Sequence, residues 1–170
     1  MVCRVYVTVI GSSAANRWEL DAAYTVGRLL AERGAVLVCG GRGGVMEAAA
    51  KGAKEAGGLT VGILPGTERR EANPYIDVAI PTGLGHARNA VNVLAGDAVI
   101  AVGGGPGTLS EIGLALAYGR PVVALRGPGA AGLLAGRELG GARVYAAGTP
   151  VEAVEAAVRL AVKRGCTNEK

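Results

Sequence analysis

Three short clusters of glycine and hydroxyl residues have the composition of loops that bind phosphate. Each follows a run of apolar residues directly; they are Gly11, Ser12, Ser13, then Gly40, Gly41, Arg42, Gly43, Gly44, and then Gly103, Gly104, Gly105, Pro106, Gly107, Thr108. Glycine lets backbone N–H groups approach an anion closely, and a helix that begins after such a loop adds a positive end. The clusters therefore predict a site for a phosphorylated ligand.

Arg88 and Glu111 are charged residues that could act at such a site. The guanidinium of Arg88 can bind phosphate through two parallel hydrogen bonds. Asn92 would share a helical face with Arg88, and Asn89 lies three residues before Asn92. The Glu111 carboxylate could accept a hydrogen bond from a ligand hydroxyl or stabilise positive charge that develops on a bound ligand. Two structural explanations compete with these roles. Arg88 could lie on a solvated helix face, and Thr108 to Glu111 has the pattern of a capping box with Thr108 as the N-cap.

The standard nucleotide-binding motifs are absent. No glycine is followed by lysine, which excludes the P-loop motif, and Thr108 stands where G-x-G-x-x-G needs its third glycine. The strand-like run that ends at Cys39 lacks the acidic residue that reads the ribose of NAD, so a hydride-transfer enzyme is disfavoured. One glycine cluster alone would be explained by a tight turn. Arg42 could either bind a second phosphate or simply be exposed.

The period of the apolar residues alternates between strand-like and helix-like along the chain. The predicted strands are 4–10, 35–39, 59–64, 75–80, 97–102, 121–125 and 142–145. The predicted helices are 16–33, 45–56, 85–94, 108–118 and 149–165, the last with Thr149 as N-cap and Glu152 completing a capping box. Continuous apolar strands between helices indicate a parallel sheet covered on both faces. We therefore predict a doubly wound, Rossmann-like α/β fold, with a single domain at 1–165 and a tail at 166–170.

In an open parallel sheet, ligands bind beyond the carboxyl ends of the strands. All three glycine clusters follow predicted strands, so they would lie along that one edge. Their convergence favours a ligand site over three unrelated turns. The same reasoning predicts that the ligand is a small phosphorylated molecule.

Composition excludes several classes of function. The chain is 50% hydrophobic and 19% charged, which excludes disorder, and it has neither a bilayer-spanning run nor a signal peptide, so we expect a cytoplasmic protein. The net charge is +4, but the arginines are scattered and aromatic residues are scarce, so a nucleic-acid partner is not expected. The three cysteines are widely separated and His86 is the one histidine, so no metal site or disulfide framework is expected.

The third cluster carries a resemblance to a known family. Residues 104–111 read GGPGTLSE and resemble the G-G-x-G-T-x-x-E signature of the LOG ("Lonely Guy") family. Residues 11–13, 40–46 and 62–65 resemble other loops of that family, so the likeness covers nearly the whole chain. The resemblance implies a phosphoribohydrolase that cuts a nucleoside 5′-monophosphate into a base and ribose 5-phosphate, with Arg88 and Glu111 as the catalytic pair.

Two departures from the LOG pattern point to a sister branch. Gly103 stands where the signature opens with proline, and Asn89 replaces a basic residue. This pattern looks closer to a branch that includes molybdenum-cofactor carrier proteins. Two hypotheses follow: a hydrolase for an AMP-like nucleotide, or a non-catalytic carrier or sensor for a phosphorylated ligand such as molybdenum cofactor. Neither requires a further cofactor.

The resemblance also has implications for an older activity label and for assembly. The LOG family was long labelled lysine decarboxylase, but a pyridoxal enzyme needs a Schiff-base lysine, and none of the four lysines lies in a glycine turn. The helices at 85–94 and 108–118 carry more apolar surface than one sheet face covers, and the LOG family dimerises through this region. We therefore predict a homodimer or a higher homo-oligomer.

Overall fold

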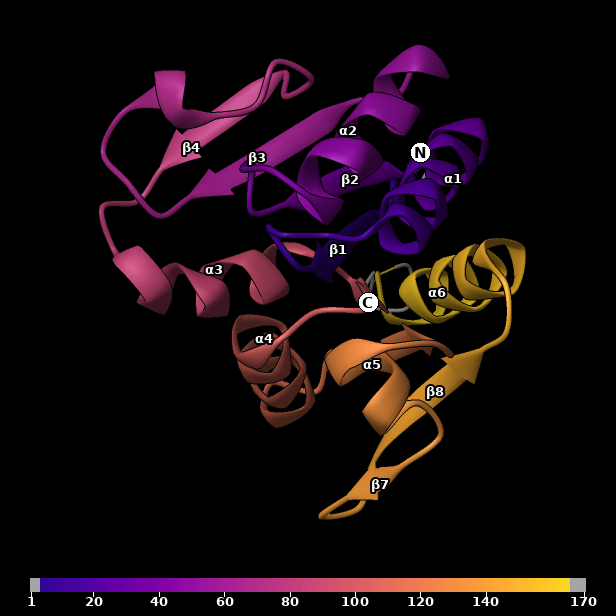
Figure 1. The fold of residues 1–170 in the computed structure, drawn as a ribbon. Helices are drawn as coiled ribbons and strands as arrows, with labels where there is room; N and C mark the ends of the chain where they lie inside the picture. The colour runs from indigo at the N-terminus through magenta and orange to yellow at the C-terminus, as the bar shows by residue number, and fades with distance from the viewer. Residues whose placement is uncertain (1–3, 166–170) are drawn as a thin grey trace.

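The computed structural model describes residues 4–165, which form a sheet of eight strands in the order β4-β3-β2-β1-β5-β6-β8-β7 (Figure 1). The strands are β1 (Tyr6–Gly11), β2 (Val36–Cys39), β3 (Thr60–Leu64), β4 (Val78–Pro81), β5 (Ala98–Val102), β6 (Val122–Leu125), β7 (Glu138–Leu139) and β8 (Ala142–Ala147). All pairs are parallel except β7 with β8. The tail predicted at 166–170 lies outside the described residues.

Helices cover both faces of the sheet. They are α1 (Arg17–Glu32), α2 (Val45–Glu55), α3 (Arg88–Ala95), α4 (Pro106–Ala117), α5 (Gly129–Leu134) and α6 (Pro150–Gly165), with short 3-10 turns η1 (Arg69–Glu71) and η2 (Gly85–Ala87). α1 contacts α2 and α6 on one side, and α4 contacts α3 and α5 on the other (Figure 1). This arrangement confirms the predicted doubly wound α/β fold. No helix within residues 4–165 is long and apolar enough to cross a bilayer.

The core has one layer on each face of the sheet. Alternation along β5 illustrates the division, because Ile100 packs with the α1, α2 and α6 layer while Val99 packs with the α3, α4 and α5 layer. All five residues of β5 are buried, as expected for a central strand of a parallel sheet. Ala, Val, Leu and Ile make up nearly all of the core.

The start of α4 differs from the predicted one. The helix begins at Pro106 with Gly105 as its N-cap, so the prediction that Thr108 is the N-cap is wrong. Proline is favoured at the first helical position because its fixed φ suits the helix and its missing N–H needs no partner there. Thr108 consequently lies inside the first turn, and the predicted capping box from Thr108 to Glu111 does not form. Glu111 is therefore not held as a cap.

The start of α6 matches its prediction in part. The Thr149 hydroxyl accepts a hydrogen bond from the Glu152 N–H at 3.2 Å, as an N-cap should. The Glu152 carboxylate accepts from Gly148 N–H at 2.7 Å, one residue before the partner that a capping box would use. Glu152 still satisfies a free donor at the helix start.

Backbone contact joins α1 and α2. A Cβ added at Gly27 would overlap the carbonyl of Ala49, and one added at Gly52 would overlap the carbonyl of Tyr24. The two glycines therefore allow the helices to approach more closely than any larger residue would. This contact fixes the spacing between α1 and α2.

Candidate functional site

The loops after β1, β2 and β5 meet at one edge of the sheet. The order reverses at β1, which pairs with β2 on one side and β5 on the other, and a crevice at such a reversal is the usual ligand site of an open α/β sheet. The first two loops are joined directly, since Val45 N–H donates to the Ser12 carbonyl at 2.9 Å. The predicted convergence of the clusters is therefore present in the structure.

A cleft of about 470 Å³ lies at this edge, and we name it the strand-end cleft. Its lining comprises Gly11, Ser12, Ser13, Arg42, Met46, Pro65, His86, Arg88, Asn89, Gly105, Pro106, Gly107, Thr108 and Glu111. Most of the predicted site residues line it. Gly40, Gly41, Gly43, Asn92 and Gly104 do not, and several of them support residues that do.

Arg88 and Glu111 face each other in the strand-end cleft. Their side chains are only 12% and 8% exposed, and Arg88 Nη1 lies 3.9 Å from Glu111 Oε1. That separation gives electrostatic attraction without a hydrogen bond, so Glu111 does not occupy the donors of the guanidinium. Arg88 Nε is buried and has no hydrogen-bond partner within the described chain. A buried donor left unpaired in this way suits a site that an anionic ligand completes.

The two asparagines organise these charges from the same helix. Asn92 Nδ2 donates to Glu111 Oε1 at 2.9 Å, and Asn89 Nδ2 donates to the Ser110 hydroxyl at 3.1 Å. Asn89 Oδ1 also accepts a long hydrogen bond of 3.4 Å from Arg88 Nη1. Both asparagines are buried, so α3 is held against the first turns of α4 by polar contacts. Asn92 thus positions the carboxylate and does not line the cleft.

Burial shifts the titration of both charged groups. Burial lowers the pKa of Arg88, while the Glu111 carboxylate opposes that shift. Burial raises the pKa of Glu111, and the hydrogen bond from Asn92 and the charge of Arg88 act in the opposite direction. A carboxylate with a raised pKa inside a cleft is a common feature of functional sites, because the surroundings disfavour its charged form until a ligand compensates.

Gly40 makes room for the Arg88 guanidinium. A Cβ at this position would lie 2.5 Å from Arg88 Nη1, so the side chain lies directly over the loop backbone. Beneath the loop, Cys39 is buried, and burial raises the pKa of its thiol to about 11. The thiol is therefore protonated and unreactive at neutral pH.

Three further residues that line the cleft have varied positions. Arg42 is exposed, and its Nη1 pairs with Glu71 Oε2 at 3.2 Å, so its charge is partly balanced already. Met46 is buried and also lines the cleft. His86 is exposed and lines the cleft from η2.

Glu19 holds a loop of the strand-end cleft, and the sequence did not identify it as part of the candidate site. Its buried carboxylate accepts hydrogen bonds from Asn16 N–H at 2.8 Å and from Gly104 N–H at 3.0 Å. Gly103 has a φ of +57°, and a Cβ there would overlap the Glu19 carboxylate. Proline cannot adopt that φ, so the glycine that replaces the signature proline belongs to this arrangement. The spacing of Asn16 and Glu19 is a capping-box signal that marks the residue in the sequence, but not its contact with the distant loop.

No side chain of the cleft forms an evident metal site. Across residues 4–165, no group of three or more histidine, cysteine, aspartate or glutamate side chains could hold a metal ion. The side-chain donors among the lining residues include Arg42, Arg88 and the hydroxyls of Ser12, Ser13 and Thr108, and the glycine loops add backbone N–H groups. This donor set matches the chemistry of phosphate.

Comparisons with known proteins agree with this chemistry. The molybdenum cofactor binding protein from the phototrophic bacterium Rippkaea orientalis is 42% identical, with a TM-score of 0.86 over 92% of this chain and 97% of its own. The molybdenum cofactor carrier protein of Chlamydomonas reinhardtii is 38% identical, with a TM-score of 0.83 over 92% of this chain and 98% of its own.

A third relative has an enzyme name. The probable cytokinin riboside 5′-monophosphate phosphoribohydrolase LOGL9 of Oryza sativa subsp. japonica is 33% identical over 112 residues, which are 64% of this chain and 49% of that protein. The alignment thus spans about half of LOGL9. Together the three similarities confirm the predicted likeness to LOG proteins near the molybdenum-cofactor carriers. The model of the SLOG cluster4 family matches residues 4–154, and the chain therefore belongs to the SLOG cluster4 family.

Proposed function

We propose that this protein binds a phosphorylated, nucleotide-like ligand in the strand-end cleft and acts as its carrier. The observation that carries the proposal is the buried Arg88 guanidinium, whose Nε lacks a partner in the described chain and whose Nη1 lies over Gly40. A phosphate bound there would accept hydrogen bonds from Arg88, from loop N–H groups and from the N-terminus of α4. The names of the relatives from Rippkaea and Chlamydomonas make molybdenum cofactor the first ligand to test.

A phosphoribohydrolase is the second candidate, and the environment of Glu111 favours it. One carboxylate oxygen is held by Asn92, and the buried group lines the cleft beside Arg88. In this reaction the C1′–N bond of a nucleoside monophosphate breaks and its electrons leave with the base. Glu111 would stabilise the positive charge left on the ribose until water adds at C1′ and one of its protons passes to the base. The likeness to LOGL9 supports the same reaction.

Phosphorylated ligands are expected to stabilise the protein more than their unphosphorylated counterparts. Ribose 5-phosphate and AMP should raise the thermal unfolding midpoint, whereas ribose and adenosine should have little effect, because the cleft offers donors for phosphate. Thermal-shift measurements test this, and the shift should shrink as salt is added to a solvent-open cleft. Equal shifts for both members of each pair would contradict the phosphate site.

Release of adenine from AMP distinguishes the hydrolase from the carrier. If the protein is a hydrolase, chromatography should detect free adenine, and Glu111→Gln should lower its rate by about 100-fold or more, as loss of electrostatic stabilisation does elsewhere. The variant should fold at least as stably as the parent. Burial raises the pKa of Glu111, so its ionised form opposes folding at neutral pH, and glutamine removes that cost. If AMP binds for hours and no free base is released, the hydrolase is excluded and only the carrier proposal remains.

We also propose that the protein is a homodimer or a larger homo-oligomer. The helices α3 and α4 pack together and leave apolar side chains exposed on their outer surface, namely Val91, Leu94, Leu109 and Tyr118. Burying them against a second copy would remove that surface from water. Light scattering at micromolar concentration should give at least twice the chain mass, and Val91→Lys with Leu109→Lys should give the monomer mass. A monomeric parent protein would refute this.

A further inference from the structure

Glu111 is the only carboxylate among the described residues that line the strand-end cleft. Its side chain is buried, and its Oε1 lies 3.9 Å from Nη1 of Arg88, the residue proposed to bind the phosphate. A phosphate on that guanidinium therefore brings a second anion beside the carboxylate. Repulsion between two anions in a buried site is strong because little water screens it. Two anionic groups held this close commonly share one proton.

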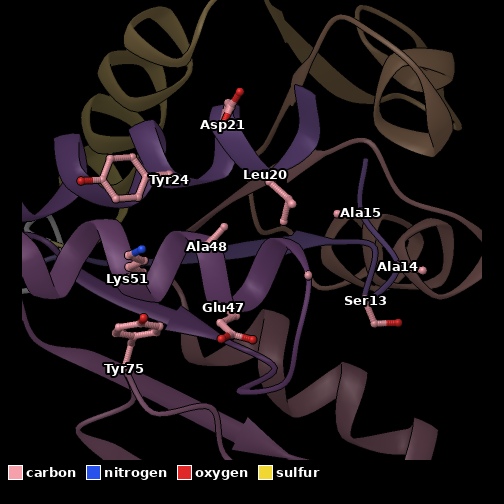
Figure 2. A pocket seen from close by; sticks show the side chains of 11 residues that line it. Ser13, Ala14, Ala15, Leu20, Asp21, Tyr24, Glu47, Ala48, Lys51 and Tyr75 are labelled. Carbon is pink, nitrogen blue, oxygen red and sulfur yellow. The ribbon is translucent and has the colours of Figure 1, made fainter. Parts of the chain in front are cut away.

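Other acidic side chains near this edge of the sheet have different surroundings. Asp21 and Glu47 line a separate groove of about 570 Å³ along α1 and α2 (Figure 2). Glu71 pairs with Arg42, the other arginine that lines the strand-end cleft. None of these three carboxylates lines the strand-end cleft. The repulsion from a bound phosphate therefore acts mainly on Glu111.

The groups that face Glu111 include one cation, Arg88, which makes its one ion pair within residues 4–165. Asn92 on α3 contributes a neutral amide, and Cys39 at the end of β2 has a thiol whose pKa burial raises to about 11. His86 lines the same cleft from η2. Burial raises the pKa of Glu111, and the hydrogen bond from Asn92 and the charge of Arg88 oppose that shift. A phosphate bound to Arg88 offsets its positive charge and so raises the pKa of the carboxyl group further.

Asn92 leaves one oxygen of Glu111 for the shared proton. Its Nδ2 donates to Oε1 at 2.9 Å, and Oε1 can accept that hydrogen bond whether the carboxyl group is ionised or protonated. Within residues 4–165, Oε2 accepts no hydrogen bond. The proton therefore resides on Oε2, from which it can be donated to a phosphate oxygen in a short, charge-assisted hydrogen bond.

We propose that the strand-end cleft binds a phosphomonoester together with one proton, which the phosphate shares with Oε2 of Glu111. The dianionic phosphate, the ionised carboxylate and one proton from solvent combine, and the O–H bond is the one covalent bond that forms. This inference rests on the proposed phosphate site and adds a control of ligand release. The complex holds one proton more than its separated parts, so the affinity falls as the pH rises.

Calorimetric titration with ribose 5-phosphate at about pH 8 counts the protons, because the phosphate of a monoester is largely dianionic there. Tris and HEPES buffers differ in their heats of ionisation, so the difference between the two titrations gives the number of protons taken up. We expect about one proton per ligand, and an affinity that falls by close to tenfold from about pH 8 to about pH 9. Glu111→Gln should take up almost none and keep a nearly constant affinity, because its amide N–H permanently replaces the shared proton.

Two variants serve as matched controls. Glu47→Gln removes the same charge from α2, outside the strand-end cleft, and His86→Gln removes the imidazole that lines the cleft. Both should keep the proton uptake of the parent and its dependence of affinity on pH. If the uptake persists in Glu111→Gln and disappears in His86→Gln, the proton lies on the imidazole and the inference is overturned.

Competition by inorganic anions supplies an independent measurement. At about pH 8, hydrogen phosphate and sulfate are dianions of the same shape, but only hydrogen phosphate carries a P–OH proton to share. Phosphate should displace ribose 5-phosphate from the parent at a concentration about tenfold or more below that of sulfate, and on Glu111→Gln the two should differ by about twofold or less. Equal displacement from the parent would overturn the inference, because Glu111 would then face another part of the ligand.

The outcomes separate this inference from the proposed function. If ribose 5-phosphate binds the parent without proton uptake, the shared proton is wrong and the phosphate site stands. If ribose 5-phosphate does not bind at all, both fail. Both of these readings come from the parent protein and do not depend on how any variant folds.

Discussion

Arg88→Ala is expected to abolish most of the stabilisation that ribose 5-phosphate gives the parent protein. A ligand at a hundredfold excess over its dissociation constant stabilises the folded state by about 2.7 kcal/mol, and a hundredfold loss of affinity would leave only about 0.4 kcal/mol of that. A loss of this size is expected because Arg88 is nearly buried, lies over Gly40 and keeps its Nε free. Denaturant titrations with and without ligand measure the difference.

Two arginine variants make this measurement specific. Arg88→Lys keeps the charge but loses the two-pronged donor, so it should recover only part of the effect. Arg42→Ala removes a cleft arginine that is exposed and already paired with Glu71, so its effect should be much smaller. If Arg88→Ala and the parent gain equal stabilisation from ligand, the phosphate lies elsewhere.

Glu19→Ala is expected to lower the free energy of unfolding by at least about 1.5–3 kcal/mol, because its buried carboxylate accepts two backbone hydrogen bonds and a single hydrogen bond to a charged group contributes about that much. The two donors are the N–H groups of Asn16 and Gly104, both held by this carboxylate. The same change should weaken ribose 5-phosphate binding, since the loop at 103–107 loses the contact that sets its shape. Urea titration measures the stability, and calorimetry measures the binding.

Glu32→Ala is the matched control for Glu19→Ala. Both residues lie on α1, but Glu32 is exposed, and its one ion pair within residues 4–165 is with Arg28 in the preceding turn. Its removal should change stability by about 0.5 kcal/mol or less. If Glu19→Ala also stays within that range, the bridge between α1 and the loop at 103–107 contributes little.

The alternating sheet and helix order could be predicted because buried strands and amphipathic helices leave different periods in the sequence. β5 shows this well, since its apolar run carries no helical spacing and ends in glycines. α5 and β7 could not be predicted in the same way. They lie in a stretch of small residues and glycines, where periodicity is weak and neighbouring elements decide the structure.

The sequence could predict the residues that line the candidate site, but not the residues, distant in the sequence, that hold them in place. Arg88 and the glycine clusters were identified from their types and positions. Glu19 was not, because a glutamate near a helix start has an ordinary local explanation, and its bond to Gly104 joins positions 85 residues apart. For Asn92, helical spacing indicated the shared face, but only the structure gives its bond to Glu111.

The pairing of β1 with β5 has a consequence for when the protein can acquire its ligand. Val9 lies opposite Ile100 in the register, so the cleft forms only after the chain between them has been synthesised and the central strands have met. The loop at 103–107 and the start of α4 follow β5, and β6 packs beside it. A nascent chain that ends before β5 contains the loops after β1 and β2, but it lacks the loop at 103–107 and the start of α4 that complete the cleft. A ligand that needs both walls of the strand-end cleft can therefore bind only after about the first two-thirds of the chain has been synthesised.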